Sequence, residues 1–175
     1  MKMTRREFLN ISTAAAVVCA ATLLPVEKAA AAQQTMAAQE LLEQAYLYAF
    51  PLVLMDATRK VSTNTETPND TRAPINQFIH AKKLADAASR AVVTPNVDTI
   101  YTQAFLDVGA EPMLYGVPQT DRFFNVQVLD AWTNTVAVLE APGLYAITRS
   151  DWQGKLPEGV QRINVPSNMV WTIAR

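Results

Sequence analysis

The residues with the clearest chemical potential lie in the octapeptide TPNVDTIY, residues 94–101. Pro95 restricts its own backbone, and Asn96 and Asp98 are residue types that accept backbone hydrogen bonds in turns. The carboxylate of Asp98 and the phenol of Tyr101 could exchange protons with a substrate or bind a ligand. The alternative interpretation is an Asx turn that only starts the strand after it.

A second candidate group follows the alternating segment 123–132, where Asp130 continues an otherwise apolar row. A carboxylate at such a position is costly to bury unless it is hydrogen-bonded or paired. Asp98 and Asp130 could converge at one end of a sheet and act as acid and base, or hold a hard cation through their oxygens. Spacing alone does not bring them together, and a structural polar network is the alternative. The predicted binding residues are Asn96, Asp98, Tyr101, Asp130, Trp132 and Asn134.

His80 is the only histidine, and Cys19, the only cysteine, lies near the N-terminus. One histidine cannot form a zinc site, and without a cysteine after residue 32 there is no thiolate ligand for zinc or an iron–sulfur cluster. No glycine-rich phosphate loop is present. We therefore predict no metal site and no cofactor. The catalytic candidates are Asp98, Tyr101, Asp130 and His80, and His80 could equally be a structural residue.

The N-terminus resembles a leader peptide. Arg5 and Arg6 precede Phe8 and Leu9 in a twin-arginine export pattern, and the apolar run 11–24 would span only about 21 Å as a helix, too short to cross a bilayer. Small residues then favour cleavage near Ala32. We expect a signal peptide at 1–32 that does not anchor the protein in the membrane, followed by a single domain at 33–175. We also expect a periplasmic location, with the twin-arginine machinery as an export partner.

The remaining sequence predicts helices followed by strands. Apolar residues at helical spacing predict a helix over 36–60, kinked or split by Pro51, and a second short helix over 75–90. Strands are predicted at 100–108, 123–132, 135–140, 144–148, 162–165 and 169–175. This order indicates an α+β fold, with N-terminal helices packed on an antiparallel β-rich sandwich. The chain stops within an apolar strand, so we expect the sandwich to be incomplete.

Several segments together resemble a bacterial family called domain of unknown function 1254. They are AYLYAFPLV at 45–53, FIH at 78–80, TPNVDTIY at 94–101, LDAWTN at 129–134 and PSNMVW at 166–171. The resemblance implies an exported or envelope-associated protein with a jelly-roll-like β-rich body and flanking helices. Members of the family usually continue into a second β-rich domain, domain of unknown function 1214, which is absent here. The resemblance supplies no catalytic residue.

Three functional hypotheses remain open. The first is a non-catalytic module that binds a small molecule, a glycan or a protein partner, such as the missing C-terminal domain or a second copy of the chain. The second is a periplasmic hydrolase or lyase that uses Asp98 or Asp130 with Tyr101 or His80. The third is a non-functional fragment of a longer two-domain protein. Nucleic acid is not expected as a partner, because 15 basic and 16 acidic residues form no basic stripe.

Overall fold

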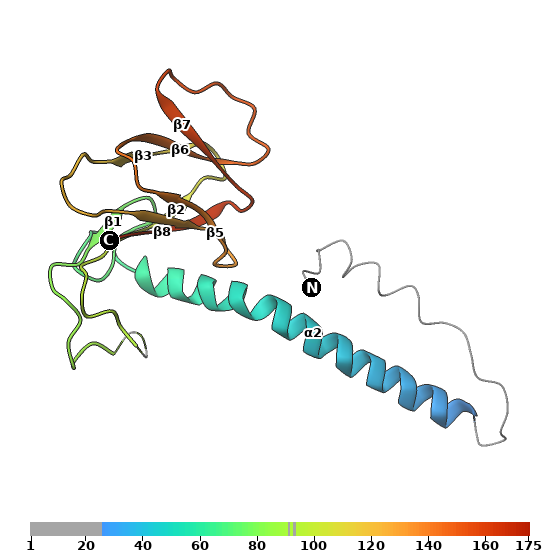
Figure 1. Ribbon diagram of the computed structural model, residues 1–175. Helices are drawn as coiled ribbons and strands as arrows, with labels where there is room; N and C mark the ends of the chain where they lie inside the picture. The colour runs from blue at the N-terminus through green and yellow to red at the C-terminus, as the bar shows by residue number, and fades with distance from the viewer. Residues whose placement is uncertain (1–25, 91, 93) are drawn as a thin grey trace. The chain divides into compact units, whose positions relative to one another are not determined.

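The structure is a computed structural model that describes residues 26–90, 92 and 94–175 (Figure 1). The chain divides into two compact units, Met1–Ala45 and Tyr46–Arg175. Residues 1–25 of the predicted leader, with Arg5, Arg6, Phe8 and Leu9, lie outside the described residues. Within the described part of the chain, no helix combines the length and the apolar character that a membrane crossing requires.

The first element among the described residues is the helix α2, Val26–Ser62. The helix predicted at 36–60 is confirmed, but it begins earlier and continues without interruption through Pro51. The good helix formers on both sides of Pro51, mainly Ala, Leu and Gln, offset the one backbone hydrogen bond that proline removes. Near the C-terminal end, Asp56 forms ion pairs with Arg59 at 2.6 Å and Lys60 at 2.7 Å. Hydrogen bonds from Lys60 and Arg59 lower the pKa of the Asp56 carboxyl.

Two β-sheets follow α2. The five-stranded sheet has the order β1-β2-β8-β4-β5, and the three-stranded sheet has the order β3-β6-β7. The strands are β1 Phe78–His80, β2 Thr102–Asp107, β3 Met113–Val117, β4 Val126–Leu129, β5 Thr135–Leu139, β6 Gly143–Arg149, β7 Val160–Val165 and β8 Met169–Ala174. All neighbours in the larger sheet are antiparallel. In the smaller sheet β3 and β6 are antiparallel, whereas β6 and β7 are parallel.

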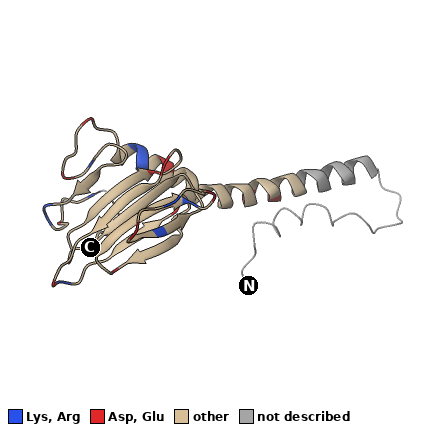
Figure 2. Cartoon of the chain, turned by 90° about the horizontal axis from the view of Figure 1, so that it is seen from above, with Lys and Arg blue, Asp and Glu red and all other residues tan. Residues whose placement is uncertain are grey.

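The core lies between the two sheets (Figure 1). In strand β8, Val170, Thr172 and Ala174 are buried, whereas the residues between them are only half-buried. This period of two is typical of a strand with one fully covered face. From the smaller sheet, Ile147 and Val165 are fully buried against this face. Most charged residues lie in loops and at strand ends rather than within the strands (Figure 2).

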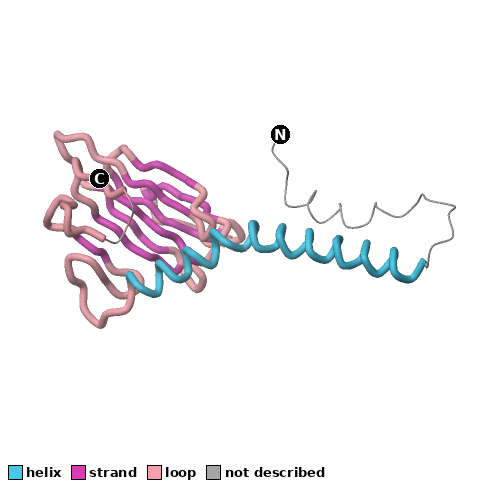
Figure 3. Tube along the Cα trace, turned by 90° about the horizontal axis from the view of Figure 1, so that it is seen from below, coloured by secondary structure: helices cyan, strands magenta, loops and turns pink. Residues whose placement is uncertain are grey.

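The other face of the five-stranded sheet carries a second apolar layer. Phe105 of β2 stacks on Trp171 of β8 with ring centroids 5.5 Å apart. In the unit Tyr46–Arg175, the C-terminal part of α2 runs along this side of the sheet (Figures 1 and 3). There Met55 is buried and the ring of Tyr48 lies 6.3 Å from that of Trp132. The α+β class and the helix packed on a β-rich sandwich are therefore confirmed.

The helix predicted at 75–90 is wrong. Asn76 adopts a left-handed conformation, with φ of 65°, and its Oδ1 accepts a hydrogen bond from the backbone nitrogen of Asp107 at 2.7 Å. The chain then forms β1, which pairs with β2, and farther on Asp86 Oδ1 accepts from the backbone nitrogen of Ala88 at 2.9 Å. Pairing with a distant strand outweighs helix propensity at residues 78–80, and the turn at Asp86 interrupts the Ala- and Lys-rich part that follows.

Candidate functional site

The first predicted group lies in the loop before β2. Asn96 Oδ1 accepts hydrogen bonds from the backbone nitrogens of Asp98 at 2.7 Å and Thr99 at 3.2 Å. This is an Asx turn, the alternative interpretation of the segment 94–101. The Asp98 side chain is exposed. The turn therefore accounts for Asn96 without a ligand and leaves the Asp98 carboxylate in solvent.

Tyr101 and His80 lie close together where β1 and β2 pair. The backbone oxygen of Tyr101 accepts from the nitrogen of Ala81 at 2.9 Å. His80 is exposed, and its Nδ1 lies 3.0 Å from the hydroxyl oxygen of Thr102, its partner residue on β2. The bond between Ala81 and Tyr101 extends the pairing of β1 and β2 by one residue at one end. Since β1 is an edge strand, the His80 ring lies at the edge of the sheet.

The second predicted group forms a closed turn after β4. Asp130 is 2% exposed, and its Oδ1 accepts from the backbone nitrogens of Trp132 at 2.8 Å and Asn134 at 3.0 Å, while Oδ2 accepts from Asn134 Nδ2 at 2.9 Å. The backbone nitrogen of Asp130 in turn donates a hydrogen bond to the backbone oxygen of Asn134 at 3.0 Å. These bonds compensate the burial of the carboxylate. Both oxygens of Asp130 are thus occupied by the turn itself.

The two groups lie at opposite ends of the five-stranded sheet. Strands β2 and β4 are both antiparallel to β8, so they run in the same direction. Tyr101 directly precedes β2, whereas Asp130 directly follows β4. The start of one strand and the end of a strand parallel to it cannot meet. The structure therefore brings Asp130, Trp132 and Asn134 together, and His80 with Tyr101, but it does not bring Tyr101 to Asp130.

Over residues 26–90, 92 and 94–175, no three side chains of the types His, Cys, Asp and Glu are grouped as they would be around a metal ion.

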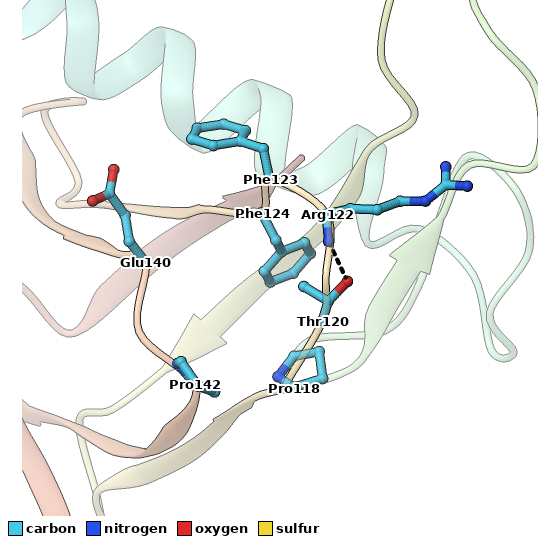
Figure 4. Close-up of a pocket in the computed structure, with 7 residues that line it drawn as sticks. All are labelled: Pro118, Thr120, Arg122, Phe123, Phe124, Glu140 and Pro142. Carbon is cyan, nitrogen blue, oxygen red and sulfur yellow. Dashed lines mark hydrogen bonds between the residues drawn. The ribbon is translucent and has the colours of Figure 1, made fainter.

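A cavity of about 260 Å³ opens at the end of the sandwich where β3 and β5 end and β4 and β6 begin (Figure 4). Its lining comes from the loop between β3 and β4 and from the turn between β5 and β6. The lining residues are Pro118, Thr120, Arg122, Phe123, Phe124, Glu140 and Pro142. We call this the Phe124 cavity, because the ring of Phe124 lies between the two loops in Figure 4.

The rim of the Phe124 cavity offers both apolar and charged groups. The Phe123 ring is 80% exposed. Arg122 and Glu140 extend on opposite sides of Phe124 (Figure 4), and both are exposed. None of the ion pairs within the described residues involves Arg122 or Glu140. The loop is shaped locally by the hydroxyl of Thr120, which accepts from the backbone nitrogen of Arg122 at 3.2 Å.

The Phe124 cavity was not predicted from the sequence. The signals were present: Pro118 and the pair Pro142–Gly143 mark turns on both sides, and Phe123 and Phe124 are adjacent aromatics just before a strand. Strand alternation assigned one of the two rings to the core and gave the other no role. The two loops lie far apart in sequence and meet only because β4 pairs with β5 and β3 pairs with β6.

Comparisons with known proteins identify the family. No curated protein shows a match to the sequence. The crystal structure of the VPA0106 protein from Vibrio parahaemolyticus, a target of the Northeast Structural Genomics Consortium, is similar, with a TM-score of 0.61 and 25% sequence identity over 78% of this chain. The match covers 32% of that protein, so this chain spans about a third of its length. The family model described as "Protein of unknown function (DUF1254)" matches residues 75–175. That is more than half of the sequence, and the chain therefore belongs to the DUF1254 family.

Proposed function

We propose that this chain is an exported, non-catalytic module that binds a small molecule or a glycan at the Phe124 cavity. The observation that carries the proposal is the rim of this cavity. There an aromatic ring that is 80% exposed stands beside a cation and a carboxylate that have no ion-pair partner in the described structure. Apolar surface with a few polar groups around it is the usual composition of a ligand site.

The size of the Phe124 cavity limits the ligand. Pockets for drug-sized molecules have volumes of roughly 300–1,000 Å³, and this cavity has about 260 Å³. It suits one sugar ring or an organic molecule of similar size. The Phe124 ring can cover the apolar face of such a ligand, and Phe123 adds apolar surface at the rim. Arg122 can donate hydrogen bonds to the ligand and Glu140 can accept them.

Binding is better supported than catalysis by the candidate acids. Asp130 has both carboxylate oxygens occupied by its own turn. Tyr101 lies at the other end of the sheet from Asp130. A general acid and a general base must both reach the same substrate. The arrangement of these residues therefore favours a structural role for Asp130 and a ligand site elsewhere.

The experiment is ligand-observed saturation-transfer NMR on the purified chain. The probes are glucose, N-acetylglucosamine and benzoate, each measured alone. We expect at least one probe to receive saturation, and Phe123→Ala and Glu140→Gln to weaken its binding about tenfold, which corresponds to about 1.4 kcal/mol. Leu114→Ala and Glu158→Gln, at exposed positions outside the cavity, are the matched controls. No binding of any probe, or equal binding by all variants, would overturn the proposal.

The proposed location is the periplasm, and the twin-arginine pattern around Arg5 and Arg6 supports it.

For the whole protein, we propose that a further β-rich domain is a partner of this chain. This proposal is supported by the VPA0106 protein, of which this chain covers only 32%. To test that partner, this chain is refolded with and without the remaining two thirds of a long relative. A pull-down then measures whether the two pieces associate. Failure of the two pieces to associate contradicts it.

A further inference from the structure

The two charged residues of the Phe124 cavity come from different parts of its wall. Arg122 belongs to the loop between β3 and β4, and Glu140 belongs to the turn between β5 and β6. Because the first residue of β4 pairs with the last residue of β5, Glu140 lies across from Asn125, which directly precedes β4. Phe124 comes between Asn125 and Arg122 in the sequence. Its ring accordingly lies between the two charged side chains, which extend on opposite sides of it in Figure 4.

One small molecule can contact both charged groups. Arg122 is three residues from Asn125, a distance of at most about 11 Å in an extended chain, and residues that face each other on antiparallel strands are about 5 Å apart. The side chains of Arg122 and Glu140 are long and exposed. Neither side chain forms an ion pair or a hydrogen bond with another described residue. Both groups are therefore available to a ligand in the cavity of about 260 Å³.

We propose that the ligand of the Phe124 cavity is an organic zwitterion whose carboxylate and ammonium groups lie at opposite ends of a small apolar body. This inference rests on the function proposed above and names the chemical class of its ligand. The guanidinium of Arg122 donates hydrogen bonds to the ligand carboxylate, and the ligand ammonium donates to the carboxylate of Glu140. The apolar body lies against the Phe124 ring. An ω-amino acid with a ring or a short methylene chain between its two charges has this form.

A zwitterion matches the rim better than an ion of one sign. An anion that reaches Arg122 comes near the carboxylate of Glu140, and a cation that reaches Glu140 comes near the guanidinium of Arg122. Each of these placements brings like charges together, which costs free energy. A ligand with one charge of each sign is attracted at both ends instead. A neutral sugar avoids the repulsion but gains neither attraction.

The aromatic residues of the rim agree with this ligand class. The face of an aromatic ring attracts a cation that lies within about 6 Å of its centroid, and the Phe123 ring is 80% exposed. Asp121, the acidic residue beside Arg122 in the sequence, is not part of the lining. The charged lining residues are therefore Arg122 and Glu140, one of each sign.

The first test compares three ligands of similar size by amide ¹H–¹⁵N titration of the full 175-residue chain at neutral pH. The zwitterion is para-(aminomethyl)benzoate, and its two analogues, para-methylbenzoate and para-methylbenzylamine, each carry one of its charges. We expect the zwitterion to bind about fivefold more tightly than either analogue, which is the effect of one exposed ion pair. The resonances that shift should be those of residues 120–124 and Glu140.

Two variants separate the contributions of the two charges. In Glu140→Gln, the preference for the zwitterion over para-methylbenzoate should be lost, because the ligand ammonium has no carboxylate partner, whereas the preference over para-methylbenzylamine should remain. Arg122→Gln should give the reverse result. Glu158→Gln and Lys155→Gln, at exposed positions outside the cavity, are the matched controls and should keep both preferences. Circular dichroism of each variant establishes that it is folded.

The second test reverses the charges of the rim. Arg122→Glu leaves two carboxylates and should prefer para-methylbenzylamine, whereas Glu140→Arg leaves two guanidinium groups and should prefer para-methylbenzoate. The double variant Arg122→Glu with Glu140→Arg carries one group of each sign again, and it should recover the preference for the zwitterion. A double variant that prefers a singly charged analogue contradicts the proposal.

The outcomes distinguish the ligand class from the function on which it rests. If glucose or a singly charged analogue shifts the same resonances and binds as tightly as the zwitterion, the cavity is a ligand site but the zwitterion assignment is wrong. A preference for the zwitterion that survives unchanged in Arg122→Gln and in Glu140→Gln also overturns the assignment. If neither these ligands nor glucose, N-acetylglucosamine and benzoate bind, both the assignment and the proposed function are overturned.

Discussion

Asn134 donates hydrogen bonds to both carboxylate oxygens of Asp130, from its backbone nitrogen to Oδ1 at 3.0 Å and from its side-chain Nδ2 to Oδ2 at 2.9 Å. The buried carboxylate therefore fixes the turn between β4 and β5. This turn also positions Trp132, whose ring lies 6.3 Å from that of Tyr48 on α2. Asp130 connects the strand pairing of the sheet to the packing of the helix.

Replacement of Asp130 should therefore destabilise the fold. We expect Asp130→Ala to lower the free energy of unfolding by about 2–4 kcal/mol, because it removes a charged acceptor and leaves the backbone donors of Trp132 and Asn134 without it. Urea titration followed by circular dichroism measures the change. Asp121→Ala, at an exposed position, is the control and should stay within about 0.5 kcal/mol of the parent. An equally small effect of Asp130→Ala would show that the turn does not depend on the carboxylate.

Stability should fall at alkaline pH because of Tyr115. Burial raises the pKa of the Tyr115 hydroxyl above its ordinary value of 10.0, and a hydrogen bond with Thr172 lowers it in part. Below pH 10 both the folded and the unfolded chains keep this proton. Above pH 10 the unfolded chain loses it first, so the free energy of unfolding decreases by up to about 1.4 kcal/mol per pH unit until the folded pKa is passed.

The variant Tyr115→Phe isolates this contribution. Urea midpoints measured between pH 8 and pH 11 should fall less steeply in Tyr115→Phe than in the parent chain. Tyr46→Phe, which alters an exposed tyrosine, should follow the parent curve. If Tyr115→Phe and the parent chain have the same alkaline slope, burial of Tyr115 is not the cause of the decrease.

The export prediction concerns residues outside the described part of the chain. Arg5→Lys with Arg6→Lys should retain the protein in the cytoplasm, because the twin-arginine pattern is read by a receptor. Cell fractionation followed by immunoblotting measures the location and the loss of the leader near Ala32. Lys2→Gln should leave export unchanged. Export of the double-lysine variant at the parent level would contradict the assignment.

Thermal unfolding distinguishes a folded module from a dependent fragment. The two sheets enclose a contiguous core that includes Val126, Ile147 and Val170, so we expect one cooperative transition by circular dichroism and calorimetry. The leader is present in the same chain and should not add a second transition. A gradual change of signal without a transition would favour the fragment hypothesis over the binding module.

Local patterns predicted much of the fold. Alternation located β2, although Ala104, Phe105 and Leu106 are all buried there because both faces of the sheet are covered. Strand β8 is buried at every second residue. The helix prediction for residues 75–90 was wrong because β1 forms only through its pairing with β2. His80 contacts Thr102 across that pairing. Helix propensity carries no information about such a partner.

The candidate site was predictable only in its local parts. The turn at Asn96 and the buried Asp130 both follow from residue type and immediate neighbours. Their separation does not, because it depends on the direction in which β2 and β4 run beside β8. The Phe124 cavity was missed for the same reason. Phe124 and Pro142 belong to different loops, and strand pairing alone makes them neighbours.

Chemical-shift mapping tests the central claim most directly. In amide ¹H–¹⁵N spectra of the chain, the probe that receives saturation should shift the resonances of residues 120–124 and of Glu140, which form the rim of the Phe124 cavity. The resonances of Asp98, Tyr101 and Asp130 should stay in place. Shifts confined to those three residues, or no shifts near Phe124 at saturating probe, would contradict the account.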